Sequence, residues 1–407
     1  MKGPMEGIRV LDLSRVLAGP YCSMLLGDMG AEIIKVEEPG KGDDTRAFGP
    51  PFIKPVEPGN YSTDYHGESA YFLSINRNKK SIALNLKSQQ AVEIIYKLAE
   101  TSDVFIENFR PGTAEKLGVG YEKIKSINPR IVYASVSGFG QTGPESLRPG
   151  YDLVIQGLSG IMDITGDPAG SPYKVGVSIG DLIAGMYAFQ GVLLALYARE
   201  KTGRGQKVDV GMLDGLSSLL TFQAGIYFAT EKSPHRKGNQ HPTICPYETF
   251  KAKDGYFNLA VGNDRIWESF CKIMKLEDLC SDEKFATNPS RVKNRDELFK
   301  VIQPVFEEKT VDEWVKIFDE AGIPAGPILS VDKVVSHPQI KAREMVVELD
   351  HPLIGKTKFM GVPVKLSDTP GKVTMPPPLL GEHTNGILQE LGFREEEIKS
   401  LKDGGVI

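Results

Sequence analysis

Residues 8–37 read IRVLDLSRVLAGPYCSMLLGDMGAEIIKVE, and this stretch decides the expected fold class. Ile8–Leu13 and Ala31–Glu37 are short apolar runs typical of strands, whereas Tyr21–Met29 between them has a helical pattern. Two strands joined by a helix form a crossover unit, in which the strands lie parallel in one sheet. The segment therefore predicts an α/β protein with a parallel or mixed sheet.

The same alternation continues along the first half of the chain. Ser81–Leu86, Asp103–Phe109 and Arg130–Ser137 are further strand-like runs, and helical patterns lie between them. Residues 138–150 follow the last of these strands and are rich in glycine. In such a sheet, loops at the carboxyl ends of the strands are where ligands bind, so this loop is a candidate part of a site.

A long apolar helix is expected to begin just after Asp181. Apolar residues recur at spacings of three and four from Leu182 to Leu196, and Gly203 supplies a helix end. Glycine and glutamine residues interrupt the run before it reaches the length of a membrane span. The pattern predicts a buried core helix and no membrane association.

Composition and charge describe an ordinary folded protein. The chain has 407 residues, of which 41% are hydrophobic, with 48 Lys+Arg against 53 Asp+Glu. This length exceeds what one core usually supports, so we expect two domains, with a boundary in the polar stretch Thr230–Cys245. A net charge of −5 argues against a nucleic-acid partner, which would need a basic stripe. The four cysteines show no C-x-x-C spacing and no signal peptide is evident, so a cytoplasmic location is expected.

Several familiar chemistries are disfavoured by their missing patterns. The six histidines are scattered without metal-ligand spacing, so no metal site is expected. A G-x-S-x-G elbow is absent, which argues against a serine hydrolase. Gly138-x-Gly140-x-x-Gly143 formally matches a dinucleotide fingerprint, but Pro144 and Pro149 prevent a clean helix start after it. The glycines are better explained as shaping an active-site loop.

Two further features are candidates for function. Residues 76–81 read NRNKKS and place three cations before a strand, with Lys87 after it; alone, this run is more typical of a solvated loop than of a phosphate site. Asp181 lies at the position of an ordinary helix N-cap. However, Gly176 and Gly180 leave space beside it and no competing nucleophile presents itself, so Asp181 is the candidate covalent nucleophile.

Seven sequence blocks, spread over nearly the whole chain, together resemble one family, the class III CoA-transferases, which also include the α-methylacyl-CoA racemases. The blocks are Gly7–Arg46, Asn76–Lys87, Val104–Gly112, Gly150–Gly160, Gly180–Ala188, Lys201–Val210 and Pro376–Thr384. The resemblance implies a Rossmann-like large domain built from both chain ends plus a smaller α/β domain. The expected division is residues 1–225 for the first part of the large CoA-binding domain, 226–330 for the small domain, and 331–407 for a linker and the return. It also implies an interlocked ring-like dimer, either a homodimer or a heterodimer with a related subunit.

The resemblance also assigns roles to residues. The family's catalytic aspartate falls on Asp181, which attacks the acyl-CoA thioester to give an anhydride and then an aspartyl-CoA thioester. No prosthetic group is implied, and the CoA thioester is a substrate. The family's CoA-binding positions fall on Val16, Ala18, Leu84, Lys87, Asn108, Phe109, Lys116 and Tyr151.

Departures from the family pattern bear on the substrate. Formyl-CoA:oxalate transferases resemble this chain but carry glutamine and tryptophan where it has Leu17 and Phe48, and their glycine-rich flap is not evident near Gly238. A more apolar pocket favours an acid larger than oxalate. The pattern resembles the branch that uses succinyl-CoA with glutarate-, mesaconate- or benzylsuccinate-type acids. The expected substrate-binding residues are Arg15, Leu17, Arg46, Phe48 and Tyr71, with Arg77 a further candidate for a second carboxylate.

Two alternatives remain open at this stage. Racemases of the family resemble G-H-D where this chain has Gly150-Tyr151-Asp152, and tyrosine is a poor base at neutral pH. A non-catalytic subunit of a heteromeric transferase is the other alternative, and the intact Asp181 argues against it.

Overall fold

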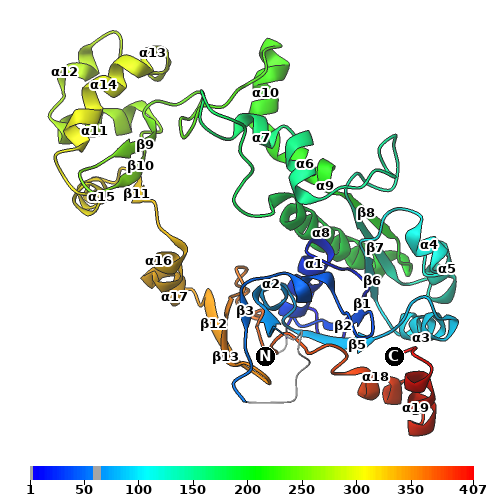
Figure 1. Cartoon of the computed structure of the whole chain (residues 1–407). Coiled ribbons are helices and arrows are strands. Elements are labelled where there is room, and N and C mark those ends of the chain that lie inside the picture. Colours follow the sequence, from blue (N-terminus) through cyan, green and yellow to red (C-terminus); the bar gives the residue numbers. More distant parts are fainter. Residues whose placement is uncertain (1–2, 58–65) are drawn as a thin grey trace. The chain divides into compact units, whose positions relative to one another are not determined.

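The computed structural model describes residues 3–57 and 66–407 (Figure 1). The chain forms two compact units, each described here by itself. Unit 1 comprises Met1–Ile161, Lys174–Gly225 and Pro338–Ile407, and unit 2 comprises Met162–Tyr173 and Ile226–His337. The short segment Met162–Tyr173 thus belongs with unit 2, whereas the sequence analysis placed it in the first part of the large domain.

Unit 1 is built on a six-stranded sheet in the order β5-β2-β1-β6-β7-β8. Every neighbouring pair in it is parallel. Numbered within this sheet, the order is 3-2-1-4-5-6, which is that of the doubly wound dinucleotide-binding fold. The predicted α/β class with a parallel sheet is confirmed. The strands are β1 (Arg9–Asp12), β2 (Glu32–Glu37), β5 (Lys79–Ala83), β6 (Val104–Glu107), β7 (Val132–Ser137) and β8 (Lys207–Gly211).

Successive side chains along these strands point to opposite faces of the sheet and belong to two separate apolar clusters, one on each face. Val10 and Ile106 join a cluster with α1 (Ala18–Asp28) and α8 (Ile179–Thr202), whereas Leu11 and Phe105 join another with α3 (Gln89–Glu100). Burial on both faces is what a parallel sheet requires. Figure 1 shows the chain end returning beside α3 and β5. This second layer also includes α5 (Tyr121–Ile127), α18 (Thr384–Glu390) and α19 (Glu395–Asp403).

The prediction of a buried α8 is only partly right. One face, with Ala184, Ala188 and Val192, is fully buried, but Leu194 is 69% and Tyr197 is 64% exposed. Small residues on the buried face allow the close packing of α8 against α1. Among the described residues, α8 is the one helix long and apolar enough to cross a membrane by length and composition, and a third of the tested stretch is buried.

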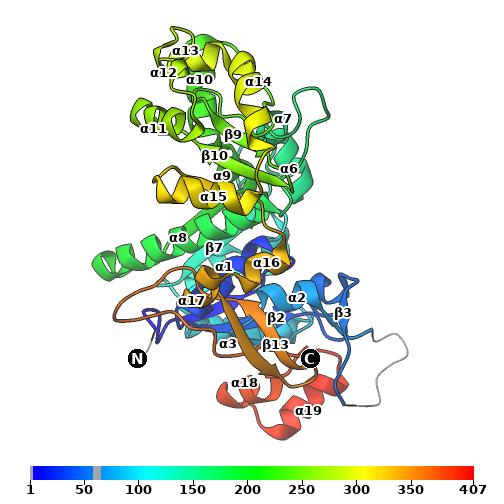
Figure 2. The ribbon, with the colours of Figure 1, turned by 90° about the vertical axis from the view of Figure 1, so that its left-hand side faces the viewer.

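Unit 1 also contains a hairpin of β12 (Val346–His351) and β13 (Gly355–Met360), visible in Figure 2. Ile354 and Phe359 of the hairpin pack on Leu73 of α2 (Ala70–Ile75). The remaining elements of unit 1 are short: β3 (Phe52–Ile53), β4 (Glu68–Ser69), α4 (Thr113–Lys116), α6 (Asp152–Leu158), α9 (Met212–Ser217), α17 (Pro338–Ala342) and the 3-10 turns Asp44–Ala47 and Ser218–Leu220. The helix α10 (Thr221–Thr230) runs from unit 1 into unit 2.

Unit 2 has an antiparallel sheet in the order β11-β10-β9. Its core is aromatic: Phe250, Phe306 and Phe318 are fully buried, and Phe306 meets Trp314 edge to face. The elements are β9 (Tyr247–Lys251), β10 (Tyr256–Ala260), β11 (Ala325–Pro327), α7 (Ile161–Ile164), α11 (Asp264–Met274), α12 (Asp278–Ser281), α13 (Asn288–Lys293), α14 (Arg295–Phe306), α15 (Val311–Glu320) and α16 (Val331–Ser336).

Candidate active site

The strand order of unit 1 determines where a ligand can bind. The connections after β1 and β6 leave the sheet in opposite directions, so a crevice opens at the carboxyl ends of these two adjacent strands. A pocket of about 310 Å³ lies there. It is lined mainly by the segments that follow β1, β6 and β7, with single contributions from the segments after β2 and β8 and from the first turn of α8. The lining residues are Arg15, Val16, Ala18, Asp44, Asn108, Phe109, Arg110, Pro111, Thr113, Val136, Ser137, Gly138, Arg148, Pro149, Gly150, Tyr151, Asp181 and Met212.

The structure brings most of the predicted CoA-binding positions together with Asp181. Val16, Ala18, Asn108, Phe109 and Tyr151 all line this pocket. The other three predicted positions lie elsewhere in unit 1: Leu84 is buried after β5, Lys87 is exposed in the loop that follows it, and Lys116 is exposed in α4. Their role in holding CoA stays a prediction.

Asp181 is the third residue of α8 and not its N-cap, which corrects the sequence interpretation. Ser178 occupies the N-cap position. The carboxylate that accepts a backbone N–H of this first turn comes from Asp152, whose Oδ1 lies 2.8 Å from the Gly180 nitrogen. A Cβ on Gly180 would lie 3.0 Å from the same oxygen, which explains the glycine beside Asp181. The Asp181 side chain is thereby left available to the pocket.

Burial and a neighbouring negative charge poise Asp181 for chemistry near neutral pH. Removal of the carboxyl from water, followed by the like charge of Asp152, raises the pKa of Asp181 to about 7. A strongly perturbed carboxyl in a cleft is a physical marker of a functional site. At neutral pH a substantial fraction of Asp181 is ionised and can act as a nucleophile, yet it is poorly solvated and therefore reactive.

Three of the residues predicted to contact the acid, Leu17, Phe48 and Tyr71, form an apolar group near Asp181. Leu17 is buried, and Tyr71 and Leu182 pack in the same cluster. Phe48 meets Tyr71 edge to face, with ring centroids 5.5 Å apart. Burial, followed by the charge of Asp181, raises the pKa of Tyr71, while a hydrogen bond with Ser178 opposes the shift. Tyr71 thus lies within electrostatic reach of Asp181, although the pocket lining does not include Leu17, Phe48 or Tyr71.

The three candidate arginines differ in what already binds them. Arg46 donates two bonds of 2.8 Å to the Glu37 carboxylate, and the buried Arg77 donates bonds of 3.0 and 2.7 Å to Asp28. A substrate carboxylate would have to displace these partners. Of the three, Arg15 lines the pocket, where it lies 3.6 Å from Asp44. The choice among the three could not be made from the sequence because no local pattern shows which carboxylate each arginine meets in the fold.

Two further arginines in the pocket were missed. Arg110 follows β6, and Arg148 lies in the glycine-rich loop, where it bonds Glu145 at 2.7 Å. Both could have been found from the sequence, because each is an arginine in a loop that follows a predicted strand, and such loops bind ligands in a doubly wound sheet. With Arg15 they give the pocket cations suited to phosphate or carboxylate groups.

The glycine-rich loop forms a pocket wall. Residues 138–150 form bends and no helix, and a Cβ on Gly138 would lie 2.9 Å from the Gly150 Cα. The backbone therefore approaches itself closely, as only glycine allows. Over residues 3–57 and 66–407, no group of three or more His, Cys, Asp or Glu side chains is placed to hold a metal ion.

A doubly wound parallel sheet with a poised carboxylate and arginines at its switch point defines an α/β enzyme that acts on an anionic ligand. Residues 5–384 match the model of CoA-transferase family III, and the chain belongs to this family. It is therefore a class III CoA-transferase, and the resemblance noted from the sequence is confirmed.

Individual relatives support this assignment. The chain is 44% identical over 405 residues to succinyl-CoA:glutarate CoA-transferase of Homo sapiens, covering 99% of this chain and 90% of the relative. It is 41% identical over 367 residues to acetyl-CoA:oxalate CoA-transferase of Acetobacter aceti, covering 90% of each. A crystal structure of a CAIB/BAIF family protein from Brucella suis has a TM-score of 0.84 at 40% identity, covering 96% of this chain and 100% of that one.

Proposed function

We propose that this enzyme transfers CoA from succinyl-CoA to a dicarboxylic acid, and that Asp181 is the covalent carrier in the exchange. The single observation that supports the carrier role best is the position of Asp181. Its carboxyl has a pKa of about 7 and lies in the first turn of α8, in a pocket lined by arginines at the point where the strand order of the sheet reverses. The relative from Homo sapiens, a succinyl-CoA:glutarate CoA-transferase, supports succinyl-CoA as the donor.

The proposed first half-reaction uses the ionised carboxylate of Asp181. An Asp181 oxygen attacks the thioester carbonyl, the C–S bond breaks, and a mixed anhydride and CoA thiolate form. The thiolate then attacks the Asp181 carbonyl, which releases the donor acid as a carboxylate and leaves an aspartyl-CoA thioester. No proton is consumed or released in either step.

The second half-reaction repeats these steps in reverse with the acceptor. The acceptor carboxylate attacks the aspartyl thioester, giving a new anhydride and CoA thiolate. Attack of the thiolate on the acyl carbonyl of the acceptor forms the product acyl-CoA and restores the Asp181 carboxylate. Both intermediates react with water, so partial burial of Asp181 serves to protect them.

We assign the nucleotide portion of CoA to the pocket cations. Arg110 and Arg148 would receive phosphate oxygens, while Val16, Ala18, Asn108, Phe109 and Tyr151 form walls of the pocket. Phosphates attract guanidinium groups strongly because the hydrogen bonds are charge-assisted. Lys87, Lys116 and Leu84 are further proposed contacts on the strength of the resemblance.

The acceptor is proposed to be a dicarboxylate longer than oxalate. Leu17, Phe48 and Tyr71 give the region near Asp181 an apolar character that suits methylene groups between two carboxylates. Arg15 is placed to receive the distal carboxylate. The acetyl-CoA:oxalate CoA-transferase has nearly the same identity to this chain as the succinyl-CoA:glutarate CoA-transferase, so the choice of acceptor rests on the apolar residues and not on overall similarity.

Assembly with a second copy, or with a related subunit, is proposed from the exposed apolar side chains of unit 1. Leu153 and Leu158 of α6 and Leu194 and Tyr197 of α8 are all more than 45% exposed. Exposed apolar side chains mark protein interfaces where they form a continuous patch. The family resemblance favours an interlocked dimer.

The four free cysteines fit a reducing cytoplasm.

A substrate panel tests the proposal. Purified enzyme is incubated with succinyl-CoA and each of oxalate, malonate, glutarate and mesaconate, and acyl-CoA products are identified by mass spectrometry. Glutarate or mesaconate should accept CoA at rates well above oxalate. Substitution of Leu17→Gln with Phe48→Trp should shift the preference toward oxalate. Preferred transfer to oxalate by the unmodified enzyme would overturn the choice of acceptor.

A further inference from the structure

The loop that follows β1 contains a strained residue in the pocket wall. Val16 has a φ of 68°, in the left-handed region that β-branched residues rarely adopt. The same residue lines the pocket with Asp181. A strained conformation persists only where the surrounding structure enforces it, and such residues cluster at functional sites.

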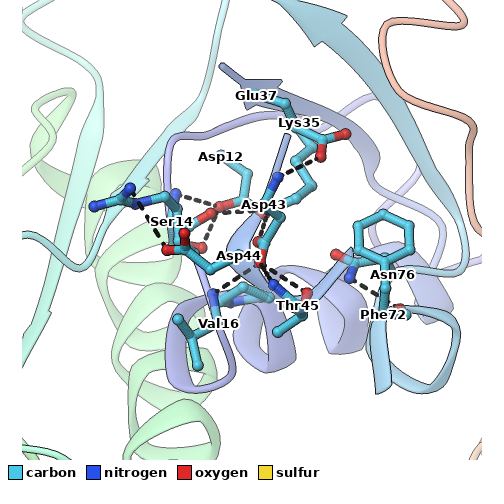
Figure 3. A network of polar contacts seen from close by, with 12 residues as sticks. Asp12, Ser14, Val16, Lys35, Glu37, Asp43, Asp44, Thr45, Phe72 and Asn76 are labelled. Atoms are coloured by element: carbon cyan, nitrogen blue, oxygen red, sulfur yellow. Dashed lines mark hydrogen bonds and ion pairs between the residues drawn. The ribbon is translucent and has the colours of Figure 1, made fainter. Parts of the chain in front are cut away.

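Two fully buried side chains hold the backbone that leads into this bend (Figure 3). Lys35 Nζ donates to the Ser14 carbonyl at 2.8 Å, and the Val16 N–H donates to Asp43 Oδ1 at 3.3 Å. Lys35 and Asp43 form an ion pair of 2.8 Å in which both side chains are 0% exposed. The pair therefore links the residue before the bend to the residue at its centre.

Asn108, which directly follows β6, holds the backbone of Arg15, the residue between Ser14 and Val16. Its Oδ1 accepts the Arg15 N–H at 2.8 Å, and its Nδ2 donates to the Arg15 carbonyl at 2.7 Å. The Ser14 N–H donates to Asp12 Oδ1 at 2.9 Å. Side chains from neighbouring strands and loops thus bond the backbone of residues 14–16 at every step.

The Asp43 carboxylate is itself fixed in orientation. The backbone N–H and the hydroxyl of Thr45 donate to Asp43 Oδ1 at 2.9 and 2.7 Å, and the Asp43 N–H donates to Glu37 Oε2 at 2.9 Å. A carboxylate held by this many partners can impose a conformation on a backbone amide that it accepts from.

We propose that Asp43, supported by Lys35, is a positioning residue of the transfer reaction. It acts through Val16: by holding the left-handed bend it fixes the pocket wall opposite the first turn of α8, so that the acyl thioester meets Asp181 in a productive orientation. This inference rests on the proposed function, because it assigns Asp43 to the step in which Asp181 attacks.

A double-mutant cycle between positions 43 and 16 tests it. Glycine adopts a positive φ without strain, so in Val16→Gly the bend should no longer depend on the hydrogen bond to Asp43. We expect Asp43→Asn alone to lower the single-turnover rate of thiolate release from succinyl-CoA about tenfold. This factor corresponds to the energetic cost of the left-handed conformation at one residue. Added to Val16→Gly, the same substitution should lower that rate less than about threefold. Equal factors in the two backgrounds would overturn the proposal.

A milder variant and a matched control accompany the cycle. Thr45→Val removes one hydrogen bond to Asp43 and should show the same non-additivity with Val16→Gly at smaller amplitude, even if Asp43→Asn does not fold. Asp103→Asn breaks the ion pair of 2.9 Å with Arg199 at the opposite edge of the sheet. It should leave the single-turnover rate unchanged.

Amide hydrogen exchange separates this inference from the proposed function. Exchange of residues 14–17 should quicken in Asp43→Asn and not in Asp103→Asn, whatever acid the enzyme prefers. Unchanged amide exchange of residues 14–17 in Asp43→Asn would show that Asp43 does not hold the bend, even if the enzyme is an active transferase. If the unmodified enzyme releases no thiolate from any acyl-CoA, the proposed function fails, while the exchange result still decides whether Asp43 holds the bend.

Discussion

Asp43 and Asp181 lie at the same edge of the same sheet and experience opposite electrostatic surroundings. Burial disfavours the charged form of both. At Asp43 the nearby Lys35 and the bonds from Thr45 outweigh burial and lower the pKa to about 2. At Asp181 the charge of Asp152 adds to burial and raises the pKa to about 7. A buried carboxylate with a cation and donors is a structural group, whereas one beside another carboxylate is poised to react.

The largest effect is expected at Asp181. Asp181→Ala removes the proposed nucleophile and should lower transfer at least about a thousandfold, because covalent catalysis has no substitute in this pocket. The acyl-CoA dissociation constant should change little. Steady-state transfer and acyl-CoA binding are measured on the same preparation, and residual transfer within tenfold of the unmodified enzyme would contradict the assignment.

The same variant should become relatively more stable as pH rises. A carboxyl whose folded pKa lies above its unfolded value weakens the fold progressively from about pH 4 to pH 7. Asp181→Ala removes that loss, so the difference in Tm between variant and parent should grow in favour of the variant over this range and stay constant above it. Thermal scans from pH 4 to 8 check the trend; a difference in Tm that does not change with pH would refute the raised pKa.

Removal of the cation from the other carboxylate should give the largest loss of stability. Lys35→Met leaves Asp43 buried and unpaired, which costs about 3–5 kcal/mol in comparable cases. Lys35→Met with Asp43→Asn should cost less, because the second substitution removes the uncompensated charge. Urea unfolding compares the two variants, and an equal or larger loss in the double variant would show that charge pairing is not what stabilises this region.

How far the sequence could predict this contrast differs between the two sites. Asp181 was recognisable because it opens an apolar helix beside a glycine, yet Ser178 proved to be the N-cap. Asp43 carried no signal, because its partners Lys35 and Val16 meet it only after the sheet has formed. The left-handed bend was equally hidden, since valine at position 16 has the opposite intrinsic preference.

The fold itself was more accessible than the site. The strands β1, β2 and β7 were predictable from their apolar runs, because burial on both faces demands such runs. The order 3-2-1-4-5-6, which creates the pocket, depends on long-range pairing that no local pattern encodes. For the same reason Arg77 could not be told apart from Arg15, because its partner Asp28 is remote in the sequence. Arg46 has its partner Glu37 nearer in the sequence, but no local pattern shows that the two side chains meet.

The pH dependence of the reaction sharpens the comparison further. Because the carboxylate form is the proposed nucleophile, the single-turnover rate of thiolate release should fall about tenfold per pH unit below about pH 7. Asp152→Asn removes the like charge and should move this limb to lower pH. Asp103→Asn, remote from the pocket, should leave it in place. An acid limb that stays unchanged in Asp152→Asn would show that Asp152 does not tune Asp181.

The smallest effects are expected from the pocket cations. Arg148→Met and Arg110→Met should each raise KM for acyl-CoA about three- to tenfold at low salt, and less at high salt, because phosphate contacts are screened. Lys80→Met, which removes a partly buried partner of Glu32 and lies outside the pocket lining, is the control. Lys87→Ala and Lys116→Ala measure whether CoA extends beyond the pocket lining. A KM equal to that of the unmodified enzyme at low salt in all four variants would remove these residues from CoA binding.

Covalent trapping tests the central claim most directly. The enzyme is incubated with succinyl-CoA and hydroxylamine, digested, and mapped by mass spectrometry. An activated Asp181 carbonyl, as anhydride or thioester, should be converted to a hydroxamate on the peptide that contains Asp181, dependent on succinyl-CoA and absent from Asp181→Ala. A racemase exchanges only an α-proton and a non-catalytic subunit activates nothing, so neither gives this product. Confirmed acceptor-dependent transfer without a hydroxamate at Asp181 would contradict the covalent mechanism.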